Sequence, residues 1–287
     1  MDPAKPSRTA FGVAVRRAIH QLHDAPPLIL TDPIAVPLLG AALLPELEKA
    51  KPDLDDHRHI ALRAWLVARS RYAEGALAQA VSQGVRQYVL LGAGLDTFAH
   101  RNPYPHLRVF EVDHPATQQW KRELLASTKL PTPANLTYTP VDFERESLPT
   151  QLAAAGLDPA LPTFFAWLGV VPYLTLPAFR ATIAFIAAQP SGSGVVFDYG
   201  QPRHALPFLE KLAHDSLAAR VQLAGEPFQL FFTPQEAAAE LAAFHGLEDL
   251  GAPEINALYF DPRAAITKSK DNLRILGSIG HLLSAWL

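Results

Sequence analysis

Short apolar runs alternate with longer amphipathic stretches along most of this chain. In its middle part, runs rich in Val, Leu, Phe and Tyr end at glycines or polar residues, which is typical of buried strands. These runs predict five strands, over residues 87–91, 108–113, 136–141, 163–169 and 194–199.

Helical periodicity fills the segments before and between these runs. Phe11, Val15, Ile19 and Leu22 fall on one stripe at spacings of three and four, which predicts a helix over residues 8–23. The same reasoning predicts further helices over residues 58–83, 115–126, 177–188 and 234–244. The tail adds a strand over residues 246–250 and a final edge strand over 281–287.

Strands that alternate with helices indicate an α/β fold. Consecutive parallel strands need crossover helices, and those helices cover both faces of the sheet. Pro140 cannot donate to a ladder, so the third strand is expected near a sheet edge. We therefore predict a mostly parallel sheet between helical layers, entered through a helical N-terminal segment.

Composition narrows the functional classes. The chain has 287 residues, a formal charge of -3 and no cysteine. Such a charge does not favour capture of nucleic acid or of an anionic membrane, and thiolate chemistry is excluded. The longest apolar run, residues 164–174, is too short to span a bilayer, and the N-terminus lacks the apolar core of a signal peptide. We expect a soluble, cytoplasmic protein.

A glycine turn directly follows the first predicted strand. Gly92 and Gly94 form a Gly-x-Gly motif at the point where an α/β sheet meets a ligand. Glycine suits this place because a Cβ would hinder both the sharp turn and the approach of a ligand.

Two acids near the tip of the second strand complete the pattern. Asp113 follows Gly92 by 21 positions, and Glu111 shares its strand face. An acid about 20 residues after the first glycine is where a ribose diol is bound in nucleoside sites. Either residue fits, and Asp113 is preferred because it is nearer the carboxyl end.

The next residues distinguish between nucleoside ligands. The third glycine of a dinucleotide motif would fall at Thr97, and Asp96 would repel a pyrophosphate at this helix start. Asp96 suits a ligand with an amino group and no phosphate, such as S-adenosylmethionine. A dinucleotide oxidoreductase is therefore disfavoured.

Several motifs together resemble the leucine carboxyl methyltransferase family. More closely, the chain is similar to the family's bacterial branch of S-adenosylmethionine-dependent O-methyltransferases. The motifs are Thr9-Ala10, Arg17-Ala18, Asp32-Pro33-Ile34-Ala35, Arg69-Ser70-Arg71, the glycine segment through Arg101, Phe110–Pro115 with Lys121, Val141-Asp142-Phe143, Trp167–Val170, Tyr173-Leu174-Thr175 and Phe197-Asp198-Tyr199.

This resemblance implies the class I methyltransferase fold, with seven strands, an antiparallel final strand and a helical cap. It implies a cap over residues 1–84 and a cofactor-binding α/β domain over 85–287, forming one continuous unit. It also implies roles for individual cofactor residues: Gly92 and Gly94 close to the cofactor, Asp113 at the ribose, Asp142 and Phe143 at the adenine, Arg69 in preference to Arg71 at the methionine carboxylate, and Leu168 beside the cofactor. Asp96 and Glu111 are kept as further cofactor-binding candidates on the grounds given above.

Leu168 also departs from the family pattern. Members that act on a phosphatase carry Glu at this position, so a protein C-terminus is not carried over as the substrate. The apolar stretch from Trp167 to Tyr173 instead suits a small apolar acid. We therefore predict an O-methyltransferase that acts on a carboxylate of a small hydrophobic molecule, with no nucleic-acid or membrane partner.

Catalytic side chains are not required for such an acceptor. A carboxylate is already ionised at neutral pH, so the enzyme aligns the reactants and excludes water. A phenol or alcohol acceptor would need a base, and Tyr173 or His204 would be the first candidates. No metal-ligand spacing is present. A protein that binds the cofactor without catalysis is the remaining alternative.

Overall fold

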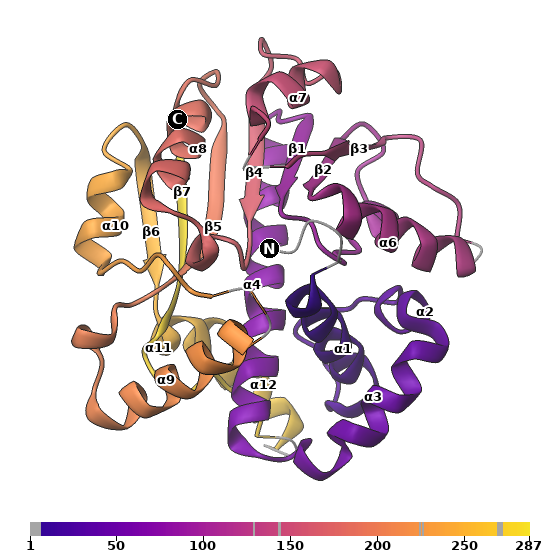
Figure 1. Cartoon of the computed structure of the whole chain (residues 1–287), viewed down its shortest axis with the longest axis vertical. Coiled ribbons are helices and arrows are strands. Elements are labelled where there is room, and N and C mark those ends of the chain that lie inside the picture. Colours follow the sequence, from indigo (N-terminus) through magenta and orange to yellow (C-terminus); the bar gives the residue numbers. More distant parts are fainter. Residues whose placement is uncertain (1–6, 129, 143–144, 224, 226, 269–271) are drawn as a thin grey trace.

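A seven-stranded sheet forms the middle layer of the fold (Figure 1). The computed structural model describes residues 7–128, 130–142, 145–223, 225, 227–268 and 272–287. The strands lie in the order β3-β2-β1-β4-β5-β7-β6. Their bounds are β1 (Gln87–Leu91), β2 (Arg108–Asp113), β3 (Leu136–Pro140), β4 (Thr163–Trp167), β5 (Gly194–Gly200), β6 (His245–Leu250) and β7 (Gly280–Trp286).

Strands β1 to β5 pair in parallel, as predicted, and β7 runs antiparallel to both of its neighbours. The expected edge position of β3, with Pro140, is confirmed. The prediction that the final strand lies at an edge is wrong, because β7 lies between β5 and β6. Strand β6 takes the edge, and its exposed polar residues suit an edge better than the buried middle of β7.

The helices agree closely with the periodicity. Each strongly periodic segment forms a helix within a residue or two of its expected ends, except that the helix predicted over 234–244 ends at Glu240. The helices are α1 (Arg8–His23), α2 (Ala35–Leu39), α3 (Leu43–Ala50), α4 (His57–Ser82), α5 (Phe98–Arg101), α6 (Pro115–Ser127), α7 (Leu148–Ala154), α8 (Leu176–Ala187), α9 (Phe208–Leu223), α10 (Pro234–Glu240), α11 (Ala252–Ile255) and α12 (Asp261–Thr267).

Alternate residues of the central strands supply two separate cores. Tyr88 and Leu90 of β1 face one core, which includes residues of α4 and α11, whereas Val89 and Leu91 face the other, which includes α7, α8 and α10. Both sides of each central strand are therefore buried. This explains why these strands read as continuous apolar runs rather than as an alternation.

The N-terminal helices form a third cluster beside the sheet (Figure 1). Residues of α1, α2 and α3 pack together with Leu95 of the glycine turn and Leu125 of α6. Helix α4, in contrast, belongs to the core on one face of the sheet. The division into residues 1–84 and 85–287 stays a prediction.

Candidate active site

The glycine turn after β1 is closely packed on two sides. Gly92 and Gly94 have φ values of +66° and +50°, which favour glycine. A Cβ on Gly92 would overlap with the side chain of Val170, and one on Gly94 would lie 3.2 Å from the Cβ of Ala10 in α1. The turn therefore lies between the loop that follows β4 and the first turn of α1.

Asp113 lies at the tip of β2 and holds this turn. Its carboxylate accepts hydrogen bonds from the backbone N–H of Gly94 and, at 2.7 Å, from that of His114. Burial raises the pKa of Asp113, and these two N–H groups oppose that effect. The contact joins the ends of β1 and β2, where the sequence predicts a ribose site.

Glu111, the alternative acid, already has a partner. Its Oε2 lies 2.6 Å from Nζ of Lys121 in α6, and both side chains are 1% exposed. Burial raises the pKa of Glu111, although Lys121 acts in the opposite direction. Its Oε1 has no hydrogen-bond partner among the described residues. This ion pair secures α6 against β2.

Asp96 belongs to a polar network that the sequence did not predict. Its carboxylate accepts hydrogen bonds from Nη1 of Arg17 at 2.9 Å and from the backbone N–H of Phe98 at 2.7 Å. Nη2 of Arg17 lies 2.7 Å from Asp32, which also accepts from the hydroxyl of Thr97. Arg17 and Asp32 lie in the quoted family motifs, but nothing local in the sequence indicates that they meet.

Charge in this network favours a cationic group near Asp96. Arg17 and Arg101 face three acids, because Arg101 contacts Asp32 and Glu74. Burial alone would raise the pKa of Asp96, but Arg17, Arg101 and Lys121 outweigh it and lower the pKa to about 2. The Asp96 side chain is 16% exposed, whereas that of Asp32 is fully buried. Asp96 thus offers a permanent negative charge at the glycine turn.

Arg69 comes from α4 and reaches the carboxyl ends of β4 and β5. Its Nη1 donates to Oδ2 of Asp198 at 3.0 Å, and no other hydrogen bond from this guanidinium is present among the described residues. The guanidinium lies against Gly169, where a Cβ would come within 2.7 Å of Nη2. Arg71, two positions along the helix, is exposed. Further donors of Arg69 are therefore free for a carboxylate.

Asp142 and Leu168 also follow strand ends. Asp142 comes two residues after β3, and its side chain is 20% exposed and lies 3.6 Å from Nε of Arg145. Leu168 follows β4 and packs against the core on the α4 side of the sheet. Phe143, the predicted adenine contact, lies outside the described residues.

Beyond the loop after β4 lies a line of aromatic rings. Tyr173 lies 5.3 Å from Phe228 between ring centroids, and Phe228 lies 6.0 Å from Phe231. All three side chains are partly exposed. Trp167, in contrast, is 2% exposed and stacks on Phe179, so it belongs to the core rather than to a pocket. His204, the other suggested base, is exposed on the turn after β5.

An acid and a histidine that the sequence did not single out meet at the β5–β7–β6 end of the sheet. Nδ1 of His281 lies 2.9 Å from Oδ1 of Asp249, and its Nε2 lies 3.0 Å from Nε2 of Gln201. Because Gln201 also donates to the carbonyl of Ser278, it donates to His281 and leaves the imidazole proton on Nδ1. Asp249 thus orients His281, while Gln201 occupies the lone pair of its Nε2.

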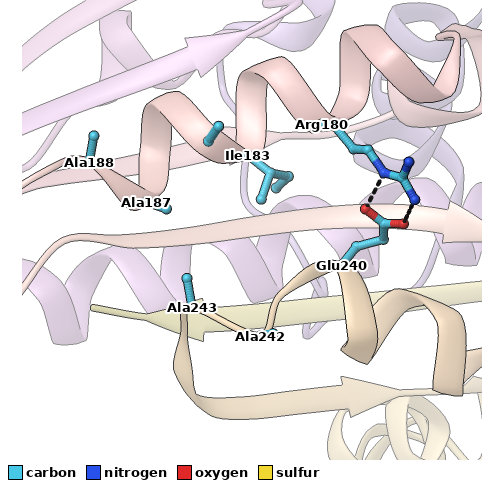
Figure 2. Close-up of a pocket in the computed structure, with 8 residues that line it drawn as sticks. Arg180, Ile183, Ala187, Ala188, Glu240, Ala242 and Ala243 are labelled. Carbon is cyan, nitrogen blue, oxygen red and sulfur yellow. Dashed lines mark hydrogen bonds and ion pairs between the residues drawn. The ribbon is translucent and has the colours of Figure 1, made fainter.

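A surface groove on another part of the molecule does not belong to this site. It runs between α8 and the turn after α10, lined by small residues and closed at one end by the Arg180–Glu240 ion pair at 2.6 Å (Figure 2). Ala187 precedes β5 and Ala243 precedes β6, so this end of the groove lies at the amino ends of parallel strands. Ligands of open α/β sheets bind at the opposite, carboxyl end.

Two negative observations complete the description. Among the described residues, no group of three His, Cys, Asp or Glu side chains could hold a metal ion. Nor does any helix in the described part combine the length and apolar character needed to cross a membrane.

Two solved structures have folds similar to that of this chain. A crystal structure of a putative methyltransferase from Thermobifida fusca aligns with a TM-score of 0.58 and 19% identity, over 99% of this chain and 96% of that one. A DUF574 family protein from Streptomyces avermitilis gives a TM-score of 0.57 and 18% identity, over 96% of both chains. The sheet order and the site at the strand ends define a protein of the class I methyltransferase architecture, as predicted.

Sequence comparison identifies the family. The family described as "Leucine carboxyl methyltransferase" matches residues 10–187. A Bacillus subtilis protein named "Putative S-adenosyl-L-methionine-dependent methyltransferase YktD" is 33% identical, over 96% of each chain. A Streptomyces coelicolor protein of the same description is 35% identical over 68% of each chain. The chain belongs to the leucine carboxyl methyltransferase family, which confirms the prediction.

Proposed function

We propose that this protein transfers the methyl group of S-adenosylmethionine to a carboxylate oxygen of a small apolar molecule. The chain is an S-adenosylmethionine-dependent methyltransferase of its family, as the sequence predicted. The carboxylate acceptor is the finer part of the proposal. The carboxylate is suggested by the description of the family. The observation that carries the apolar body of the acceptor is the row of partly exposed rings, Tyr173, Phe228 and Phe231, next to the loop that touches the glycine turn.

The residues at the strand ends fit the cofactor. Gly92 and Gly94 leave no side chain in its path, and Asp113 would accept from the ribose hydroxyls. Asp96 would hold the amino group, because its carboxylate has a lowered pKa and is partly exposed at the glycine turn. Arg69 would donate to the methionine carboxylate. Leu168 and Asp142, which follow β4 and β3 at the carboxyl edge of the sheet, would lie near the adenosine.

Methyl transfer to a carboxylate requires the chain to align the acceptor with the cofactor and little else. When bound, the cofactor supplies a methyl carbon that bonds to the acceptor oxygen as the carbon–sulfur bond breaks, leaving a methyl ester and S-adenosylhomocysteine with no proton transferred. The aromatic rings would exclude water and orient the acceptor. Because a carboxylate is ionised at neutral pH, no side chain must remove a proton.

The chemical nature of the methylated product tests the proposed carboxyl methylation. Deuterated cofactor is incubated with phenylacetate, indole-3-acetate, octanoate and an organic-acid extract, and mass spectrometry follows the label. We expect a labelled ester that mild alkali hydrolyses, formed at a rate that rises as the acid ionises and is flat above neutrality. If every labelled product is stable to alkali, carboxyl methylation is contradicted. Failure to release any S-adenosylhomocysteine would indicate a non-catalytic binding protein.

A hydroxyl acceptor is the second candidate, and the Asp249–His281 pair favours it. A phenol or alcohol must lose its proton, and Nε2 of His281 could take it once the hydrogen bond from Gln201 to that nitrogen breaks. In that case the product would be an alkali-stable ether, and the rate would rise near neutral pH. His281→Gln would then reduce the rate, whereas it would leave ester formation unchanged.

The proposed contact between Asp113 and the ribose predicts a change in cofactor affinity. Asp113→Ala should weaken S-adenosylhomocysteine binding by about 1–3 kcal/mol, because the ribose hydroxyls lose an acceptor. Glu111→Gln is the matched control on the same strand, since Glu111 is occupied by Lys121. Titration calorimetry measures both. An unchanged affinity in Asp113→Ala, or a larger loss in Glu111→Gln, would assign the ribose to Glu111.

A further inference from the structure

Two glycines lie opposite each other at the carboxyl edge of the sheet. Gly200, the last residue of β5, pairs with Gly280, the first residue of the antiparallel strand β7. Neither glycine has a positive φ, so the backbone conformation at these positions does not require glycine. A glycine in a strand often marks a place where another group approaches closely. The reason for this glycine pair therefore lies in the groups that cover it.

An aromatic ring covers each glycine of the pair. A Cβ on Gly280 would come within 2.8 Å of the ring of Trp65 in α4, and a Cβ on Gly200 would come within 3.3 Å of the ring of Phe231. Residues directly opposite each other in an antiparallel pair point to the same face of the sheet. The two rings therefore lie next to each other on one face, and both side chains are partly exposed.

Helix α4 places Trp65 next to Arg69, the proposed partner of the methionine carboxylate. The two residues are one turn apart on the same face of the helix. Arg69 pairs with Asp198, which lies two residues before Gly200 and therefore on the same face of β5. The helix thus crosses this face with Arg69 beside the strand and Trp65 at the carboxyl edge.

The ring of Phe231 extends the apolar surface in the other direction. It continues through Phe228 to Tyr173, with centroid distances of 6.0 and 5.3 Å. Tyr173 follows β4 in the same loop as Val170, which touches the glycine turn. The ring surface is made of four partly exposed side chains, those of Trp65, Phe231, Phe228 and Tyr173. It follows the carboxyl edge of the sheet, where ligands of open α/β sheets bind.

We propose that the methyl acceptor is an aromatic carboxylic acid, whose ring packs on Trp65 and Phe231 while its carboxylate faces the cofactor. This inference rests on the proposed carboxyl methylation and names the class of acid. Aromatic rings attract one another in offset and edge-to-face arrangements, in addition to the gain from the area that they bury. Trp65 and Phe231 therefore favour a planar acid over a saturated acid of similar size.

Phenylacetate and cyclohexylacetate test this preference, because they differ only in the saturation of the ring. In the parent, KM for cyclohexylacetate should exceed that for phenylacetate roughly threefold to tenfold. Trp65→Leu should reduce this ratio by about half or more, and Phe231→Leu, on a different segment, should reduce it as well. The Kd of Trp65→Leu for S-adenosylhomocysteine should not change, because Arg69 keeps its partner Asp198.

Trp286→Leu is the matched control. The ring of Trp286 also packs over a strand glycine, Gly194, but this contact lies at the amino end of β5 and so at the opposite edge of the sheet. The variant should keep the KM ratio of the parent. An equal fall of the ratio in Trp286→Leu and Trp65→Leu would show a general effect of lost packing and would overturn the role of Trp65.

The outcomes separate this inference from the proposed function. If neither test acid nor an organic-acid extract gives an ester, carboxyl methylation fails and the aromatic preference fails with it. If both test acids give esters with equal KM values, or if Trp65→Leu and Phe231→Leu keep the ratio of the parent, only the aromatic preference is overturned. If neither test acid is a substrate, an aromatic acid methylated in the extract supports the inference and an aliphatic one overturns it. If Trp65→Leu does not fold, Phe231→Leu decides.

Discussion

Arg69→Ala is expected to weaken S-adenosylhomocysteine binding by about 2–5 kcal/mol, or roughly 30-fold to several thousand-fold, and to lower methyl transfer accordingly. Two losses contribute to this effect. The methionine carboxylate loses its proposed cation, and Asp198, whose side chain is 6% exposed, loses the partner that lies 3.0 Å away. Titration calorimetry and a methyl-transfer assay measure the two consequences.

Arg71→Ala provides the control, because Arg71 lies on the same helix but is exposed. It should bind the cofactor product as the parent does. Arg69→Lys keeps the charge without the planar fork and should be intermediate. Normal affinity and normal thermal stability in Arg69→Ala would remove Arg69 from the site, and a loss in Arg71→Ala would transfer the role to that residue.

Arg63→Ala is expected to reduce the free energy of unfolding by about 3–5 kcal/mol, because it removes the guanidinium that pairs with a buried carboxylate. Nε and Nη2 of Arg63 in α4 lie 2.9 and 2.8 Å from the two oxygens of Asp24, which follows α1. Both side chains are 3% or less exposed, and His20 Nδ1 lies 2.7 Å from the same carboxylate. The pair joins the first helix to α4.

The same carboxylate gives stability a defined pH dependence. Burial alone would raise the pKa of Asp24, but His20 and Arg63 outweigh it and hold the pKa below its ordinary value. A lowered folded-state pKa contributes stability that is complete above the unfolded pKa of about 3.9. That contribution is lost as the pH falls from there through the lower folded-state pKa. Asp24→Asn should therefore flatten this acid limb.

Denaturant unfolding at several pH values measures both effects. Arg58→Ala is the control on the same helix, because the Arg58–Asp56 pair is exposed, and it should cost less than about 1 kcal/mol. A loss below about 1 kcal/mol in Arg63→Ala as well would show that the buried pair contributes no more than a surface pair.

The elements of the fold could be predicted because each depends on neighbouring residues. The β1 run Gln87–Leu91 and the β2 run Arg108–Asp113 form strands at the predicted bounds, since both sides of each strand are buried. The position of Gly92 and Gly94 after a strand, with Asp113 at the tip of the next, also depends on local order and on the rule that parallel strands end at one edge. The sequence by itself therefore determined the architecture and the family, and it led to the proposed place of the cofactor.

Only the tertiary structure decided which distant groups meet. Arg17 pairs with Asp96, Asp249 with His281, and β7 inserts between β5 and β6, all across long sequence separations. Spacing along a chain encodes the faces of single helices and strands, whereas contacts between elements depend on how all of them pack together. For that reason the proposed cofactor residues followed from strand tips, whereas the ring contacts of Tyr173, Phe228 and Phe231 required the folded chain.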